Sequence, residues 1–175
     1  MAIDLRPLGK LILRSLKAWG SGNTKPATGP SGAKTQTRPA GVGGPYPGDF
    51  SGPLRPKYSP KPDGQPDPGE IVWGWVPYEE DYSRGKDRPV LLVGADAKWL
   101  LGLMLTSKDH DHGARADDYV DIGAGAWDRQ GRPSEVKVDR VIRLDPASIR
   151  REGAVLDKVL FHEVSRALRA HQDRR

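Results

Sequence analysis

Short apolar segments bounded by turn residues fill residues 69–175 of this 175-residue chain. Their length and alternation are typical of β-strands. The segments are EIVWGWVP, RPVLLVG, KWLLGLMLT, DYVDIGAG and SEVKVDRVIRLD, of which the last is long enough for two short strands. Two helices are expected after them: a short one that starts at Pro146 and ends before Gly153, and an amphipathic one over DKVLFHEVSRALRAH. A mainly β fold is therefore expected, a small barrel of about five strands with flanking helices.

The segment before this domain has the composition of a linker. Residues 20–69 hold 11 of the 16 Pro and 11 of the 21 Gly of the chain. Such a composition offers too little apolar surface to offset the conformational entropy that ordering costs. We therefore expect a disordered Pro/Gly-rich linker over residues 20–68, followed by one folded domain over residues 69–175.

Residues 1–19 have the periodicity of a basic amphipathic helix. The apolar face consists of Leu5, Leu8, Ile12, Leu16 and Trp19, and four Lys and Arg side chains lie opposite. Two interpretations are open: residues 3–19 bind an anionic membrane surface, or their apolar face packs on the protein itself or on a partner helix. No apolar run approaches the ~20 residues of a membrane span, and basic residues interrupt any secretory signal. We expect a cytoplasmic protein, with peripheral contact with the inner face of the membrane as the further option.

Composition excludes several kinds of site. The chain has no Cys, which rules out disulfides, thiolate metal sites and Cys nucleophiles. It also lacks a Gly-rich phosphate loop, an HExxH motif and a GxSxG motif. The formal net charge of +5 comes from residues 1–68, with ten Lys and Arg against four Asp and Glu. The positive charge therefore says little about the partners of the folded domain.

Arg88 directly precedes Pro89 at the start of the RPVLLVG segment. The residue before a proline is pushed toward extended backbone, so Arg88 is expected at a loop-to-strand junction. If the second and third strands pair as a hairpin, the start of one lies beside the end of the other. Thr106 and Ser107 are then neighbours of Arg88. A guanidinium beside two hydroxyls and Lys108 predicts a pocket of phosphate size.

Aspartate and histidine alternate from Asp109 to His112, in the loop that follows the KWLLGLMLT segment. The spacing matches no closed ligand set, so a solvated polar loop is expected and no metal site. His110 is a candidate proton carrier because imidazole titrates near neutrality.

The order and spacing of EIVWGWVP, RPVLLV, LTS and VDRVIRLD resemble the PemK/MazF toxins of bacterial type II toxin–antitoxin systems, over about residues 69–168. The resemblance implies a homodimeric SH3-like barrel that cleaves single-stranded RNA at short sequence motifs and inhibits growth. Cleavage needs neither metal nor cofactor, because the 2′-hydroxyl of the substrate attacks the adjacent phosphate. A cognate antitoxin peptide, lying over the RNA groove, silences the toxin.

The resemblance also assigns roles to residues. The catalytic pair falls on Arg88 and Thr106, and the acidic residue before the late Ile-Arg strand falls on Asp139. Ser83 stands where many relatives have a Glu. The further candidates for proton exchange or phosphate positioning are Ser107, His110 and Glu80. The candidates for RNA binding are Tyr82, Arg84, Lys86 and Lys108.

Aromatic residues are the remaining candidates for contacts with RNA bases. The stacking candidates are Tyr78, Tyr82, Trp99 and Trp127, of which Tyr82 is preferred because it lies in the polar loop beside Arg88. Core or dimer packing is the preferred interpretation for Trp73, Trp75 and Trp99.

Two other function classes stay open. Because Ser83 replaces the Glu of the relatives, the domain is alternatively a catalytically silent barrel that binds RNA, DNA or a protein. A toxin that inhibits a protein target such as a topoisomerase is the third option, against which the pair of Arg88 and Thr106 argues.

Overall fold

The computed structural model describes residues 35–37, 44–110 and 114–174, without the side chains of residues 151–153. The chain divides into two units, Met1–Gly32 and Ala33–Arg175, and every described residue belongs to the second. The helix expected over residues 3–19 and the first part of the expected linker lie outside the described residues. No helix in the described part of the chain is long and apolar enough to cross a membrane.

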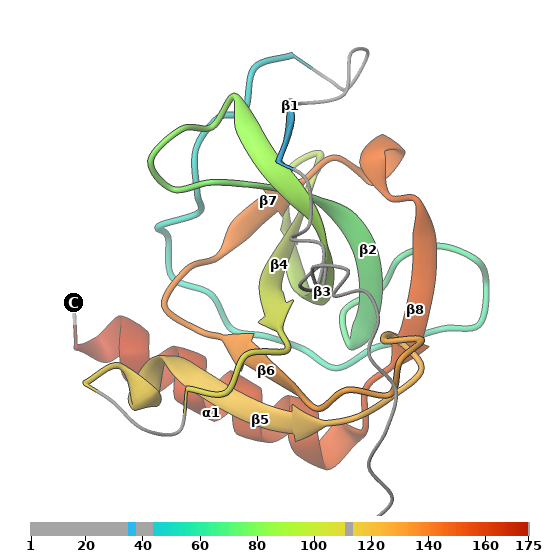
Figure 1. The fold of residues 1–175 in the computed structure, drawn as a ribbon, viewed down its shortest axis with the longest axis vertical. Coiled ribbons are helices and arrows are strands. Elements are labelled where there is room, and N and C mark those ends of the chain that lie inside the picture. Colours follow the sequence, from blue (N-terminus) through green and yellow to red (C-terminus); the bar gives the residue numbers. More distant parts are fainter. Residues whose placement is uncertain (1–34, 38–43, 111–113, 175) are drawn as a thin grey trace, which may run out of the picture. The chain divides into compact units, whose positions relative to one another are not determined.

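Eight strands, two short 3-10 turns and one α-helix make up the described part of this unit (Figure 1). The strands are β1 (Gln36–Thr37), β2 (Glu70–Pro77), β3 (Arg84–Asp96), β4 (Trp99–Thr106), β5 (Tyr119–Gly123), β6 (Ser134–Lys137), β7 (Ile142–Leu144) and β8 (Arg151–Val155). The 3-10 turns are η1 (Ala116–Asp118) and η2 (Pro146–Ser148), and the helix is α1 (Lys158–Asp173). The expected mainly β fold is confirmed.

All strand pairs are antiparallel, and the main order is β5-β6-β4-β3-β2-β8, with β1 added to β3 and β7 added to β4. The pairing shifts register at three points, between Ile71 and Val72, between Leu92 and Gly94, and between Asp121 and Gly123. Irregularities of this kind bend a sheet. The sheet therefore curls into a half-barrel, with α1 running along β5 (Figure 1).

Two apolar clusters lie on opposite faces of the central strands. Leu91 and Val93 belong to a cluster that includes α1 through Phe161, whereas Val90 and Leu92 belong to a second cluster with β7. A strand buried on both faces explains the unbroken VLLV run in the sequence. Helix α1 starts where Asp157 accepts a hydrogen bond from the Val159 N–H at 2.7 Å, and it agrees with the predicted amphipathic helix.

The prediction of a short helix from Pro146 is wrong beyond the first turn. Asp145 caps η2 by accepting a hydrogen bond from the Ala147 N–H at 2.9 Å, but the chain then becomes extended and forms β8. The reason is nonlocal, because β8 pairs with β2 and satisfies the backbone groups of that strand's outer edge. The SEVKVDRVIRLD segment forms two short strands, β6 and β7, and not one long strand.

Residues 44–69 lie against the sheet, although their composition predicts a disordered linker. Leu54 is buried, the Phe50 N–H donates to the Val141 carbonyl at 2.8 Å, and the Tyr58 hydroxyl donates to the Leu156 carbonyl at 2.9 Å. The few apolar side chains of this segment each meet the core. Its many prolines also restrict the unfolded chain, which lowers the entropy lost on ordering.

Strand β3 turns into β4 through Ala97 and Lys98, as the predicted hairpin requires. Ala97 has a φ of 52°, a conformation that disfavours a residue with a Cβ by about 1–2 kcal/mol. We expect Ala97→Gly to stabilise the fold by about 0.5–1 kcal/mol, after allowance for the extra entropy of the unfolded glycine. Thermal unfolding measures this, with the exposed strand residue Ala95 as the matched control. Ala95→Gly should destabilise, and equal losses in both variants would contradict the turn geometry.

Candidate active site

A row of three polar side chains, on β3, β4 and β6, marks the end of the sheet at which β4 stops. The β3–β4 register pairs Val90 with Met104, and continuing it by two residues places Thr106 opposite Arg88. The β4–β6 register then pairs Thr106 with Glu135. Directly opposite residues of antiparallel strands point to the same face. Thr106 and Glu135 are therefore neighbours on one face, and Arg88 joins them on that face when the β3–β4 register is extended beyond Val90 and Met104.

Arg88 lies inside β3 rather than at its start, because the strand begins at Arg84. Its side chain is half-buried, and within the described part of the chain no hydrogen bond or ion pair engages its guanidinium. Neighbouring side chains are the Tyr78 ring and Lys86, whose Nζ lies 5.9 Å from the centre of that ring. A hydrogen bond with Thr35 lowers the pKa of Tyr78, and the charges of Lys86 and Arg88 act in the same direction. The face is thus basic and carries an aromatic ring.

Thr106 ends β4 with its side chain almost fully buried, at 8% exposure. Its Oγ1 accepts a hydrogen bond from the Lys108 N–H at 3.2 Å, so the hydroxyl hydrogen remains available for donation. Ser107 and Lys108 follow with exposed side chains. Thr106, Ser107 and Lys108, which the sequence predicts to lie near Arg88, therefore stand in succession at the end of β4.

A cavity of about 230 Å³ opens beside this end of β4. Its lining residues are Ser107, Lys108, Asp109, Asp121, Pro133, Ser134 and Glu135. The volume is below the ~300–1,000 Å³ of common small-molecule pockets. It suits one group of a longer ligand, such as one phosphate and its sugar, better than a complete small-molecule substrate.

His110 lies on the same side of the site and is firmly held. Its Nδ1 lies 2.7 Å from Glu135 Oε2, and its backbone N–H donates to Glu135 Oε1 at 3.0 Å. The imidazole stacks on the Tyr119 ring, with the ring centres 3.9 Å apart and the planes at 1°. The side chain is still 30% exposed. The described start of this loop is therefore anchored at His110, whereas Asp111 and His112 lie outside the described residues.

The loop between β2 and β3 places its carboxylates elsewhere. Glu80 is exposed, and no described contact joins it to Arg88 or Thr106. Ser83 donates to Asp81 Oδ1 through its N–H at 2.9 Å and its hydroxyl at 2.6 Å, and this lowers the pKa of Asp81. Asp87 forms an ion pair with Arg150. The position at which many relatives have a Glu is thus part of a local turn.

The predicted RNA-binding residues are distributed along this same loop and the strand that follows. Tyr82 is 38% exposed and packs edge-on against Tyr46, with ring centres 5.0 Å apart. Arg84 is exposed and Lys86 half-buried. Trp127 is only 5% exposed, because it packs in the core and donates to Ser134 Oγ at 3.1 Å. It is therefore wrong as a base-stacking candidate.

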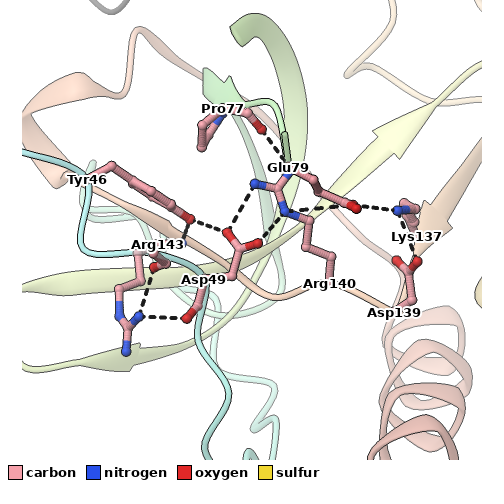
Figure 2. Close-up of polar contacts among 9 residues, drawn as sticks. Tyr46, Asp49, Pro77, Glu79, Lys137, Asp139, Arg140 and Arg143 are labelled. Carbon is pink, nitrogen blue, oxygen red and sulfur yellow. Dashed lines mark hydrogen bonds and ion pairs between the residues drawn. The ribbon is translucent and has the colours of Figure 1, made fainter. Parts of the chain in front are cut away.

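Asp139 belongs to an ion-pair network beside the row (Figure 2). Lys137 Nζ lies 3.0 Å from Asp139 and 2.9 Å from Glu79. Burial lowers the pKa of Lys137, but the hydrogen bonds to Glu79 and Asp139 outweigh it, and the pKa is raised. Glu79 in turn lies 3.9 Å from Arg140. These contacts support a structural role for the acidic residue that the resemblance implied.

The network continues to the segment before β2 (Figure 2). Arg140 is buried and binds both oxygens of Asp49, at 2.6 and 3.1 Å, and the Pro77 carbonyl at 2.7 Å. The Tyr46 hydroxyl donates to Asp49 Oδ1 at 2.6 Å and accepts from the Arg143 N–H at 3.2 Å. Burial raises the pKa of Tyr46. Arg140 thus fastens residues 46–49 to the end of β2, next to the loop that bears Tyr82.

Comparison with protein families bears on this arrangement. Residues 67–171 match the model of the PemK-like, MazF-like toxins of type II toxin–antitoxin systems. This chain belongs to the PemK/MazF toxin family. The match covers the segment over which the resemblance was expected and confirms it. A comparison with curated protein sequences finds no match.

Three solved structures are among those similar to this PemK/MazF domain. A mycobacterial endoribonuclease in complex with its cognate antitoxin has 14% identity and a TM-score of 0.48, over 62% of this chain and 95% of that chain. A MazE–MazF complex from Deinococcus radiodurans has 22% identity and a TM-score of 0.45, over 62% and 95%. The Mycobacterium tuberculosis toxin MazF-mt6 has 14% identity and a TM-score of 0.42, over 58% and 96%.

Two residues of this PemK/MazF domain escaped the sequence analysis. Glu135 lies in the SEVK segment, whose alternation does not reveal that Glu135 pairs across the sheet with Thr106. Asp49 lies in the Pro/Gly-rich segment, and its contact with Arg140 spans 91 residues of sequence. No local signal marks Glu135, which lies between Ser134 and Val136.

Proposed function

We propose that this chain is the endoribonuclease toxin of a toxin–antitoxin system and cleaves single-stranded RNA through the 2′-hydroxyl of its substrate. The observation that carries the proposal is the row of Arg88 and Thr106, in which a half-buried guanidinium without a described partner lies beside a hydroxyl. A cation left without a carboxylate in a folded site is suited to an external anion. Family membership makes RNA the expected source of that anion.

The row suits a transphosphorylation. The substrate's 2′-oxygen attacks the adjacent phosphorus and the bond from phosphorus to the 5′-oxygen breaks, which gives a 2′,3′-cyclic phosphate and a 5′-hydroxyl. The 2′-hydroxyl loses one proton and the leaving oxygen gains one. Negative charge grows on the phosphoryl oxygens, and Arg88 and the Thr106 hydroxyl are placed to stabilise it by hydrogen bonds.

The surroundings of the row suit an extended RNA strand. Lys86 and Lys108 supply positive charge beside it, and Tyr78 and Tyr82 offer rings to unpaired bases. Ser107 lines the cavity at the end of β4, and we assign it the binding of the next phosphate. We assign backbone binding to Arg84 as well, and we assign no role in the reaction to Glu80.

The partners follow from the same proposal. A cytoplasmic homodimer that binds a cognate antitoxin is expected, because the family consists of toxins of type II toxin–antitoxin systems. One structure similar to this chain is an endoribonuclease in complex with its cognate antitoxin.

A cleavage assay with the full chain tests the proposed function. The protein is incubated with a long single-stranded RNA in the presence of EDTA, and the products are separated on a denaturing gel. Discrete fragments are expected. If the folded protein cuts no RNA under any condition but still retains it on a filter, the alternative function holds, that of a catalytically silent binding module. The Ser83–Asp81 turn in place of a Glu is the observation that favours this alternative.

Membrane contact through residues 3–19 stays a prediction that rests on the sequence. We expect the full chain to float with vesicles that contain anionic lipid and to remain at the bottom with neutral vesicles. Replacing Arg6, Lys10, Arg14 and Lys17 by Gln should abolish flotation. An unchanged partition after this replacement would show that the basic face does not bind membrane.

A further inference from the structure

His110 and Glu135 form a pair that the family assignment leaves without a function. Glu135 is 7% exposed and directly opposite Thr106 on the neighbouring strand. Its two oxygens bind two different groups of His110, the ring Nδ1 at 2.7 Å and the backbone N–H at 3.0 Å. Both the position and the orientation of the imidazole are thereby determined.

The geometry leaves the other ring nitrogen, Nε2, without a partner among the described residues. When Nδ1 carries the proton that Glu135 accepts, Nε2 has a lone pair available for a substrate proton. The Tyr119 ring covers one face of the imidazole at 3.9 Å, so rotation of the ring is restricted. The side chain is 30% exposed, which leaves a path for substrate. A fixed tautomer with one accessible nitrogen is the arrangement of a general base.

We propose, on the basis of the proposed function, that His110 is the general base of RNA cleavage and that Glu135 is its positioning residue. Nε2 takes the proton of the attacking 2′-hydroxyl, and the imidazolium that forms is stabilised by the Glu135 carboxylate. The leaving 5′-oxygen takes a proton from water, and the imidazolium later returns its proton to the solvent. Glu135 is paired with Thr106 and binds His110, so this base lies beside the phosphate that Arg88 is proposed to bind.

The ionisable groups around His110 come from three elements. Glu135 on β6 contacts it directly, and Tyr119 on β5 stacks on it. Asp121 on β5 and Lys108 and Asp109 on the loop of His110 line the adjoining cavity with Glu135. Of these groups, Glu135 is the carboxylate bonded to the ring, so its removal should change the pH dependence of the reaction most.

The test is the single-turnover rate of RNA cleavage by the full chain between pH 5 and pH 9. His110→Ala is expected to reduce the rate about 10²–10⁴-fold and to remove the fall of the rate at acid pH. Free imidazole in the buffer should restore part of the rate. His162→Gln is the matched control, because His162 is exposed on α1 and its variant should cleave as the wild type does.

Glu135→Gln distinguishes positioning from simple support of the loop. The amide oxygen still accepts the His110 backbone N–H, but an amide NH2 then faces the ring Nδ1, and no carboxylate stabilises the imidazolium. We expect a rate at least tenfold lower and a changed pH profile of the rate, from a protein that still unfolds cooperatively. A 2′-O-methyl RNA, which cannot be cut, should bind both variants with wild-type affinity, which shows that the site has folded.

The proposal fails if His110→Ala cuts within threefold of the wild-type rate with the same pH profile, or if imidazole restores nothing while Glu135→Gln is unaffected. Arg88→Ala separates this failure from that of the proposed function. An inactive Arg88 variant beside an active His110 variant overturns the base alone, whereas a wild-type protein that cuts no RNA overturns both.

Discussion

Replacing Arg88 with Ala is expected to reduce the rate of RNA cleavage about 10³-fold, the loss found when one preorganised donor to a developing negative charge is removed. Arg88 has no described partner to compensate, and it lies in the middle of β3, where the strand holds its backbone. Because the guanidinium is half-buried, its charge is less screened by water than that of a surface arginine. Single-turnover kinetics with a saturating excess of enzyme measures the change.

Two variants show whether the loss belongs to the site. Arg88→Lys retains the charge but not the two-pronged geometry, and it should recover only part of the rate. Arg166→Ala removes an exposed arginine of α1 and should leave the rate unchanged. Equal rates for Arg88→Ala and Arg166→Ala would contradict the role assigned to Arg88.

Replacing Arg140 with Met is expected to lower the free energy of unfolding by about 3 kcal/mol, the lower end of the range for breaking a buried ion pair. Arg140 is 8% exposed, and its loss leaves Asp49 and the Pro77 carbonyl without their donor. The melting temperature of a chain of this size should fall by about 6–12 °C, at about 2–4 °C per kcal/mol. The Asp49 side chain is 24% exposed, so water can hydrate its carboxylate when Arg140 is removed, which keeps the expected loss of stability at the lower end of the range.

The pair of Arg132 and Asp128 provides the control for Arg140. Arg132 binds Asp128 at 2.7 Å, which is as short as the Arg140 contacts, but its side chain is 54% exposed. We expect Arg132→Ala to cost less than about 1 kcal/mol. Thermal and denaturant unfolding of both variants decide the point. A similar small loss in both would mean that residues 46–49 do not depend on Arg140 for their position.

Local pattern was sufficient for the part of the fold that carries Arg88 and Thr106. The VLLV and LLGLML segments lie close in sequence and are joined by a two-residue turn, so their pairing follows from the hairpin alone. The register then places Thr106 opposite Arg88. The prediction was wrong for the start of β3, because Gly85, Lys86 and Asp87 pair with β2 and extend the strand.

Nonlocal contacts explain what the sequence analysis missed. Glu135 is paired with Thr106 because β4 pairs with β6, and residues 151–155 become a strand because β2 offers them an edge. The order of residues 44–69 depends on single contacts of Phe50, Leu54 and Tyr58 with a distant core. A prediction from composition uses the average residue content of the whole segment. Three apolar side chains hardly change that average, although their contacts order the segment.

The chemical identity of the cleavage products tests the central claim most directly. The full chain is incubated in EDTA with one sequence made as RNA, as 2′-O-methyl RNA and as DNA. Cutting of the RNA alone is predicted, with 5′-hydroxyl ends that polynucleotide kinase labels without prior phosphatase treatment, and with 2′,3′-cyclic phosphates at the other ends. Cleavage of the 2′-O-methyl RNA or the DNA, or products with 5′-phosphates, would contradict attack by the substrate's own 2′-hydroxyl.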